Sequence, residues 1–95
     1  MELRPELAEY AQAIERTLRR HDKEKGDSWK ECSHQWLNGK LVEEVVEYLR
    51  AEGLSDAEIV EKVVEHLIQS VRHKSSSSEA VDVGAVGMML FQRNR

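Results

Sequence analysis

The chain has 95 residues and a formal net charge of −4, with 14 Lys and Arg against 18 Asp and Glu. This acidic balance argues against binding to a nucleic-acid polymer, because phosphate contacts require clustered Lys and Arg. The single cysteine, Cys32, excludes an intrachain disulfide, and no run reaches the roughly 18 consecutive apolar residues of a membrane span.

The composition is rich in Glu, Lys, Leu, Val and Ala, which favours an all-α protein with residues 1–95 in one domain. A chain this short buries only a small core, so we expect an oligomer. The N-terminal segment MELRPELAEY lacks the layout of a signal peptide, and one cysteine suits a reducing compartment. We therefore expect a cytoplasmic protein that does not enter a membrane.

Apolar residues at spacings of three and four predict a first helix from about Pro5 to His21. Its apolar positions are Leu3, Leu7, Tyr10, Ala11, Ile14 and Leu18. The segment HDKEKGDSWKECSHQ then interrupts the pattern with charge and Gly26, and it predicts a loop that contains Trp29. A second helix is predicted from about Ser33 to Glu52, ending before Gly53.

A third helix is predicted to begin at the capping box SDAE, Ser55 to Glu58, and to end near His73. Its broad apolar stripe consists of Ile59, Val60, Val63, Val64, Leu67, Ile68 and Val71. The serines of KSSSSEA then predict a boundary, after which a fourth helix runs to QRNR. Gly84 and Gly87 weaken an isolated helix, so we expect close helix packing at these positions, with the close approach of a ligand as the alternative.

Two carboxylates, Glu79 and Asp82, fall on the apolar face of the fourth helix when residues are placed at about 100° intervals. Glu79 has an alternative interpretation, since Ser76 to Glu79 fits a capping box. Asp82 has none. An ionised carboxylate in a packed face is costly unless it is protonated, paired or bound to a metal, and we expect a cation beside it.

Three acids on the second helix, Glu43, Glu44 and Glu47, span an arc of about 100° at the border of its apolar stripe. A solvated acidic face is the alternative interpretation, with Lys40 partly compensating the charge. If the second and fourth helices pack together, Glu44 and Glu47 can face the acids of the fourth helix. Such oxygen ligands suit Mg²⁺ or Mn²⁺ bound to substrate phosphates, which implies phosphoryl or pyrophosphoryl hydrolysis.

The motifs EEVVE, residues 43–47, and EAVD, residues 79–82, resemble the EExxE and ExxD motifs of the MazG-like nucleoside triphosphate pyrophosphohydrolases. The segments GDSWKECSHQWLNGKLVEEVVEYL and EAVDVGAVGMML extend the resemblance to residues 25–50 and 79–93. It implies an antiparallel four-helix all-α fold, assembled as a homodimer or homotetramer. It also implies Mg²⁺-dependent hydrolysis of an NTP or dNTP to the monophosphate and pyrophosphate, with Mn²⁺ as a possible substitute.

The resemblance also assigns roles to individual residues. Metal ligands would be Glu44, Glu47, Glu79 and Asp82, and Glu43 would support the cluster or help to orient water, so that Glu43 and Glu44 are the expected catalytic residues. Substrate contacts would come from Lys40, Trp29 and Lys25, and Trp36 is a further stacking candidate, although both tryptophans also suit a core or staple position. Two features depart from the family: Ala85 stands where many relatives have Asn, and residues 48–78 separate the motifs by an additional helix.

The sequence patterns that would indicate other functional classes are weaker. A di-iron bundle requires two Glu-x-x-His pairs on core helices, and the chain has only Glu31 and His34, at a loop-to-helix boundary. The other histidines, His21, His66 and His73, lack metal-ligand spacing, and Cys32 suits a small packing position. A non-catalytic oligomerisation or regulatory module that retains the MazG-like fold stays the alternative function, and Ala85 keeps it open.

Overall fold

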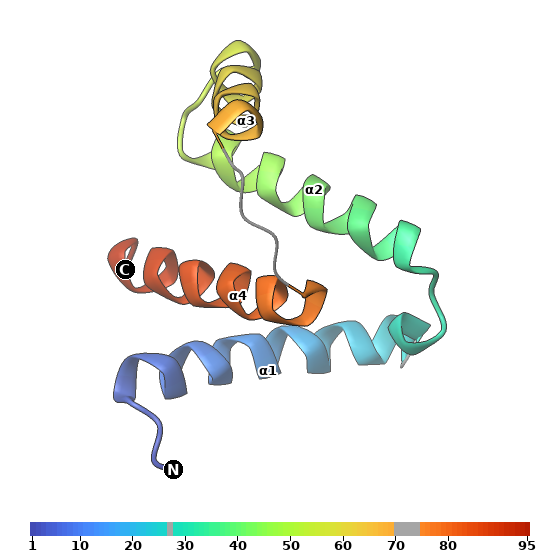
Figure 1. Ribbon diagram of the computed structural model, residues 1–95. Coiled ribbons are helices and arrows are strands. Elements are labelled where there is room, and N and C mark those ends of the chain that lie inside the picture. The colour runs from blue at the N-terminus through green and yellow to red at the C-terminus, as the bar shows by residue number, and fades with distance from the viewer. Residues whose placement is uncertain (27, 70–74) are drawn as a thin grey trace. The chain divides into compact units, whose positions relative to one another are not determined.

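The computed structural model describes residues 1–26, 28–69 and 75–95, and within these ranges the chain is helical, with no strand (Figure 1). This confirms the expected all-α class. No helix in the described ranges combines the length and apolar character required to cross a membrane. The elements are α1 (Pro5–Lys25), the short 3₁₀ helix η1 (Ser28–Lys30), α2 (His34–Ala51), α3 (Asp56–Gln69) and α4 (Ser76–Arg93).

Helix α1 continues to Lys25, so the predicted end near His21 is wrong by about one turn. No glycine or proline lies between His21 and Lys25, and Lys23 and Lys25 interact favourably with the negative end of the helix dipole. Termination comes at Gly26, whose φ of +57° is a conformation that side chains with a Cβ rarely adopt. Charge alone therefore does not end this helix; glycine does.

Helix α2 has the two boundaries that its sequence predicts. At its start, the Ser33 hydroxyl accepts a hydrogen bond from the Trp36 backbone N–H at 3.1 Å. At its end, the N–H groups of Gly53 and Leu54 donate to the carbonyls of Arg50 and Leu49, at 2.9 and 3.1 Å. This is a Schellman motif, and it requires the positive φ that Gly53 provides.

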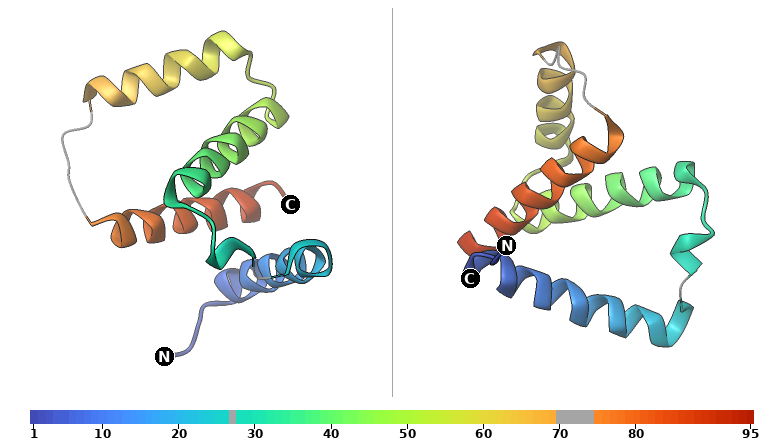
Figure 2. Two further views of the ribbon diagram at one scale, coloured as in Figure 1. Left: turned by 90° about the vertical axis from the view of Figure 1, so that its right-hand side faces the viewer. Right: turned by 60° about the horizontal axis from the view of Figure 1, so that its bottom comes forward.

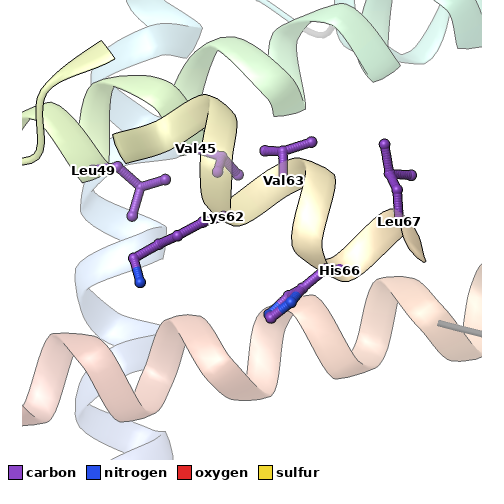
Figure 3. A pocket seen from close by; sticks show the side chains of 6 residues that line it. All are labelled: Val45, Leu49, Lys62, Val63, His66 and Leu67. Carbon is purple, nitrogen blue, oxygen red and sulfur yellow. The ribbon is translucent and has the colours of Figure 1, made fainter. Parts of the chain in front are cut away.

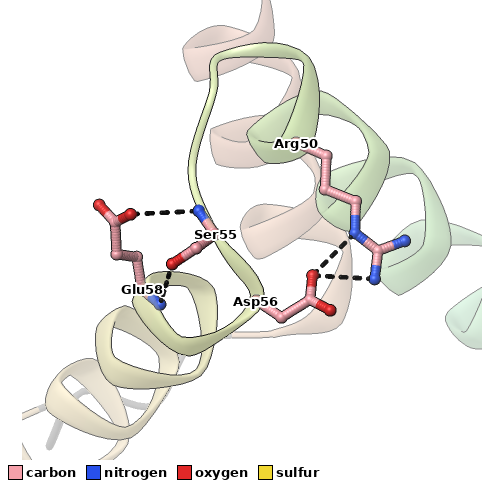
Figure 4. A network of polar contacts seen from close by, with 4 residues as sticks. All are labelled: Arg50, Ser55, Asp56 and Glu58. Atoms are coloured by element: carbon pink, nitrogen blue, oxygen red, sulfur yellow. Dashed lines mark hydrogen bonds and ion pairs between the residues drawn. The ribbon is translucent and has the colours of Figure 1, made fainter.

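The capping box predicted at Ser55 is confirmed at the start of α3 (Figure 4). The Glu58 N–H donates to the Ser55 hydroxyl, and the Ser55 N–H donates to the Glu58 carboxylate, both at 3.2 Å. The Arg50 guanidinium forms an ion pair with the Asp56 carboxylate at 3.1 Å, which links the end of α2 to the first residue of α3. The predicted helix end near His73, and Val71 of the apolar stripe, lie outside the described residues.

The capping box predicts a pH-dependent contribution to stability. Hydrogen bonds from Ser55, with a smaller contribution from the charge of Lys62, hold the pKa of Glu58 below its ordinary value of 4.5. A lowered folded-state pKa stabilises the fold fully above about pH 4.5, and this stabilisation is lost as the pH falls through the folded-state pKa. In thermal unfolding, the difference between wild type and Glu58→Gln should therefore be largest near neutral pH and shrink toward pH 3.

Replacing the cap itself provides the control for this effect. Ser55→Ala removes a hydroxyl that caps α3 at every pH, and we expect it to lower the free energy of unfolding by about 1 kcal/mol. A Glu58→Gln difference that stays constant with pH would contradict the role of the ionised carboxylate.

Helix α4 begins at Ser76. A capping box formed by Ser76 and Glu79 would require Ser76 to be the N-cap and the helix to begin one residue later. The N-cap is Ser75, whose hydroxyl accepts from the Ser78 N–H at 3.2 Å, so Ser78 occupies the third helical position. The interpretation of Ser76 to Glu79 as a capping box is therefore wrong. Four adjacent serines offer several caps of similar quality, and Glu79 is left without a capping role.

The chain comprises two compact units, Met1–Gly26 with His73–Arg95 and Asp27–Arg72. In the first unit α1 and α4 cross, and the first half of α1 contacts the last half of α4 (Figures 1 and 2). The Tyr10 and Phe91 rings pack with their centroids 5.4 Å apart. The Gln92 side chain donates to the Glu6 carbonyl at 3.0 Å, and Gly87 lets α4 approach Tyr10 closely.

In the second unit α2 leads through a short turn into α3, and the two helices diverge from that turn (Figure 2). Ile59, at 7% exposure, is the single buried apolar side chain in the described ranges. Every α-helix also has several large apolar side chains that are more than one-third exposed. The expected antiparallel bundle, single domain and oligomer therefore stay predictions.

Candidate functional site

The three acids of α2 lie on the helix face that is turned away from α3. Val45 and Leu49 line an apolar groove of about 490 Å³ together with residues of α3 (Figure 3). With about 100° per residue, Glu43, Glu44 and Glu47 point about 100–160° away from these two side chains. All three acids are exposed. The second unit thus leaves its acidic face open.

Lys40 joins two of these acids. Its ammonium lies 3.5 Å from a Glu43 oxygen and 3.3 Å from a Glu44 oxygen, one helical turn along the same face. The hydrogen bond to Glu44, followed by the charge of Glu43, raises the pKa of Lys40 above its ordinary value of 10.5. The Lys40 ammonium therefore partly compensates the negative charge of Glu43 and Glu44, as the sequence predicts.

A shallow hollow of about 300 Å³ adjoins this ion-pair cluster on α2. Trp36 is 52% exposed and borders the hollow, so the interpretation of this tryptophan as a core residue is not supported. The complete lining is Gln35, Trp36, Gly39, Lys40 and Glu43. Sequence analysis missed Gln35 and Gly39, although their spacing of four residues indicates a shared helix face.

The two acids of α4 also lie away from the packed side of their unit. Gly87 and Phe91 face α1, and at about 100° per residue Glu79 and Asp82 lie about 80–180° from them. Both acids are exposed, and the neighbouring Val86 is 54% exposed. The expectation that these carboxylates are turned into a packed face is therefore wrong within this unit.

The expected metal ligands divide equally between the two units, with Glu44 and Glu47 on α2 and Glu79 and Asp82 on α4. In the described ranges, no three or more His, Cys, Asp or Glu side chains converge to hold a metal ion. The donors themselves fit Mg²⁺, which prefers carboxylate oxygens. Each unit thus supplies two suitable ligands on an open face, and the four-ligand cage stays a prediction.

Comparisons of the chain with protein-family models, with curated proteins and with solved structures found no match. The assignment of a function consequently depends on the residues of this chain and on the resemblance of its two acidic motifs.

The other predicted substrate residues flank the start of α2 in sequence. Trp29 lies in η1 and is 52% exposed, with the Lys30 ammonium 5.7 Å from its ring centroid. Like Trp36, it is not a core residue. Lys25 is the exposed last residue of α1. An open indole and an open ammonium are compatible with substrate contact, and both roles stay predictions.

The remaining candidates have local roles. The Cys32 thiol is half-buried and donates to the Ser28 carbonyl at 3.2 Å, which is compatible with the expected small packing residue. Glu31 lies in a turn and His34 is the first residue of α2, so this pair is not held on core helices as a di-iron site requires. His66 is exposed beside the groove between α2 and α3, whereas His73 lies outside the described residues.

Proposed function

We propose that the protein is an Mg²⁺-dependent nucleoside triphosphate pyrophosphohydrolase that converts an NTP or dNTP to the monophosphate and pyrophosphate. The observation that carries the proposal is the open cluster of Lys40, Glu43 and Glu44 beside the Trp36 hollow. It combines a cation for phosphate, carboxylates for metal and water, and an aromatic ring for a base on one helix face. The motifs EEVVE and EAVD supply the resemblance to a family with this activity.

Glu44, Glu47, Glu79 and Asp82 are the proposed ligands of the metal ion, with Mn²⁺ as a substitute for Mg²⁺. The bound metal supplies positive charge that neutralises the triphosphate and the departing pyrophosphate. Because Glu79 has no capping role and is exposed, it is available as a ligand. The ion pairs of the Lys40 ammonium with Glu43 and Glu44 support the proposal that the α2 acids attract a cation.

The chain's own side chains then have separate tasks. Lys40 pairs with a phosphate oxygen, which loosens its hold on Glu44. Glu43 accepts a proton from the attacking water, whose oxygen forms a bond to the α-phosphorus while the bond from that phosphorus to the bridging oxygen breaks. The bridging oxygen leaves with pyrophosphate. Trp36 stacks on the base, with Trp29 and Lys25 as further substrate contacts.

Assembly and location complete the proposal. We propose an antiparallel four-helix domain that functions in the cytoplasm as a homodimer or homotetramer. Support comes from the exposed apolar faces of the described helices, because a monomer rarely leaves so many large apolar side chains in water.

The decisive experiment is a pyrophosphate-release assay on a panel of all common NTPs and dNTPs, with Mg²⁺, Mn²⁺ or EDTA. We expect release from at least one nucleotide, its loss with EDTA and its recovery with added Mg²⁺. Analysis of the nucleotide product should show the monophosphate and no diphosphate, which separates cleavage at the α-phosphorus from cleavage at the γ-phosphorus.

A non-catalytic oligomerisation or regulatory module is the second candidate function. The exposed apolar stripe of α3 favours it, since such a surface serves association without any chemistry. Absence of metal-dependent turnover with every nucleotide in the panel, from a protein that is folded and assembled, would support this alternative.

A further inference from the structure

The second half of α1 carries a line of cations on one side of the helix. This line is here named the basic stripe, and it consists of Arg16, Arg19, Arg20 and Lys23, all of them exposed. At about 100° per residue the basic stripe occupies an arc of about 100°, opposite the apolar positions Ile14 and Leu18. It extends over roughly 10 Å of helix axis.

The basic stripe lies away from the contacts between α1 and α4. Those contacts involve Glu6, Glu9 and Tyr10 in the first half of α1, and the second half of α1 diverges from α4 (Figure 2). Glu9 falls within the same arc two turns earlier, but its carboxylate is paired with Arg95. The side of α1 that carries the stripe is therefore open to a ligand.

Neighbouring acids leave most of this positive charge available. Within the described ranges Arg16, Arg20 and Lys23 form no ion pair. Arg19 contacts the Glu15 carboxylate at 2.9 Å, and an ion pair exposed on both sides contributes little to stability. The acids in the same half of α1 lie about 40–60° outside the arc. The arc itself is purely basic over two turns.

A straight row of cations of this length fits a chain of phosphates. A DNA duplex carries one phosphate charge per roughly 1.7 Å of its axis, so about six lie within the length of the basic stripe. Each cation therefore has a phosphate within reach. Three of the four are arginines, whose planar guanidinium binds phosphate oxygens in bidentate fashion.

Two other anionic partners fit the basic stripe less well. Proteins that bind single strands stack the bases on aromatic side chains, whereas the one aromatic residue of α1, Tyr10, packs on Phe91. An amphipathic helix enters a membrane surface with its apolar face. Insertion of Ile14 and Leu18 would hold the stripe about one helix diameter, roughly 10–12 Å, away from that face.

We propose that the basic stripe binds the phosphodiester backbone of a nucleic-acid duplex without selection for base sequence. Contacts to phosphates position a duplex and do not read its bases. The net charge of −4 argues against this partner only as an average over the chain. Exposed charges more than about 10 Å apart are screened at 0.1 M salt, so a bound duplex responds mainly to the stripe. The inference does not depend on the proposed hydrolysis.

Fluorescence anisotropy of a short labelled DNA duplex, titrated with the full chain, tests the basic stripe. With four phosphate contacts the association constant should fall with salt at a logarithmic slope of about −3.6, which is roughly 100-fold between about 50 and 200 mM salt. Arg16→Gln combined with Arg20→Gln should raise the Kd at least about 10-fold at low salt and reduce the slope to about −1.8.

Arg4→Gln combined with Lys62→Gln is the matched control, because it removes the same charge from exposed positions outside the stripe. It should leave the Kd within about twofold of wild type, and circular dichroism verifies that both double variants stay helical. Equal weakening by the two double variants would overturn the proposal, since net charge would then govern binding. So would a wild-type chain that does not bind the duplex at low salt.

Two further probes separate the duplex from other anionic partners. Vesicles of phosphatidylcholine and phosphatidylserine present an anionic membrane, and polyglutamate presents the carboxylates of an acidic protein. We expect the wild-type chain to bind both more weakly than the duplex. Binding to either probe as tightly as to the duplex would overturn the assignment to nucleic acid.

Discussion

Glu44→Gln and Asp82→Asn are each expected to lower kcat/KM for pyrophosphate release by at least about 100-fold. Each change removes one negative oxygen ligand but keeps the size of the side chain, so the metal ion is held less tightly and in a less defined position. Both side chains are exposed, and the fold should therefore tolerate the changes. The measurements are the assay itself and the Mg²⁺ concentration at half-maximal rate, which should rise in both variants.

Glu61→Gln is the matched control for these two variants. It neutralises an exposed carboxylate of α3 that belongs to neither acidic motif, and the rate should stay within about twofold of wild type. Glu44 and Asp82 lie on different helices in different units. If only one of the two variants loses activity, the proposed four-ligand site with ligands from both α2 and α4 is wrong. The metal site then lies on the helix of the affected residue alone. If both retain full activity, the assignment of these residues as metal ligands fails.

Local signals predicted most of the helix boundaries because the interactions that form them lie within a few residues. The capping box at Ser55 and the Schellman motif at Gly53 are encoded in short segments, and both are present. The errors came where the local signal was ambiguous. Charge near His21 resembled a loop, although only Gly26 ends α1, and four adjacent serines permitted a cap at Ser75 instead of Ser76.

For the candidate site, the sequence predicted which residues share one face of a helix. Helical periodicity placed Glu43, Glu44 and Lys40 together, and Lys40 contacts both acids. Periodicity does not determine which other helix covers a face. Glu79 and Asp82 lie among apolar residues, which suggested a packed face, yet α4 packs on α1 through the side with Gly87. A helix that is apolar over much of its circumference can pack on several sides, and sequence alone does not choose one.

The two glycines of α4 should respond oppositely to the same substitution. Gly84→Ala is expected to raise the free energy of unfolding by up to about 1 kcal/mol, because a Cβ there meets nothing within 4 Å and alanine favours the helix. At Gly87 a Cβ would lie 2.5 Å from the Tyr10 hydroxyl oxygen. Gly87→Ala should therefore lower stability, since relieving this clash moves Tyr10 from its packing on Phe91.

A double variant separates the clash from every other effect at Gly87. Tyr10→Phe removes the hydroxyl and keeps the ring, whose nearest carbon would lie 3.4 Å from the new Cβ, a distance the ring can accommodate by a small shift. Gly87→Ala combined with Tyr10→Phe should thus be more stable than Gly87→Ala alone, by about 1 kcal/mol or more in denaturant unfolding. Equal gains from Gly84→Ala and Gly87→Ala would mean that α4 does not approach Tyr10 in solution, and the acid-bearing face of α4 would then need to be reassigned.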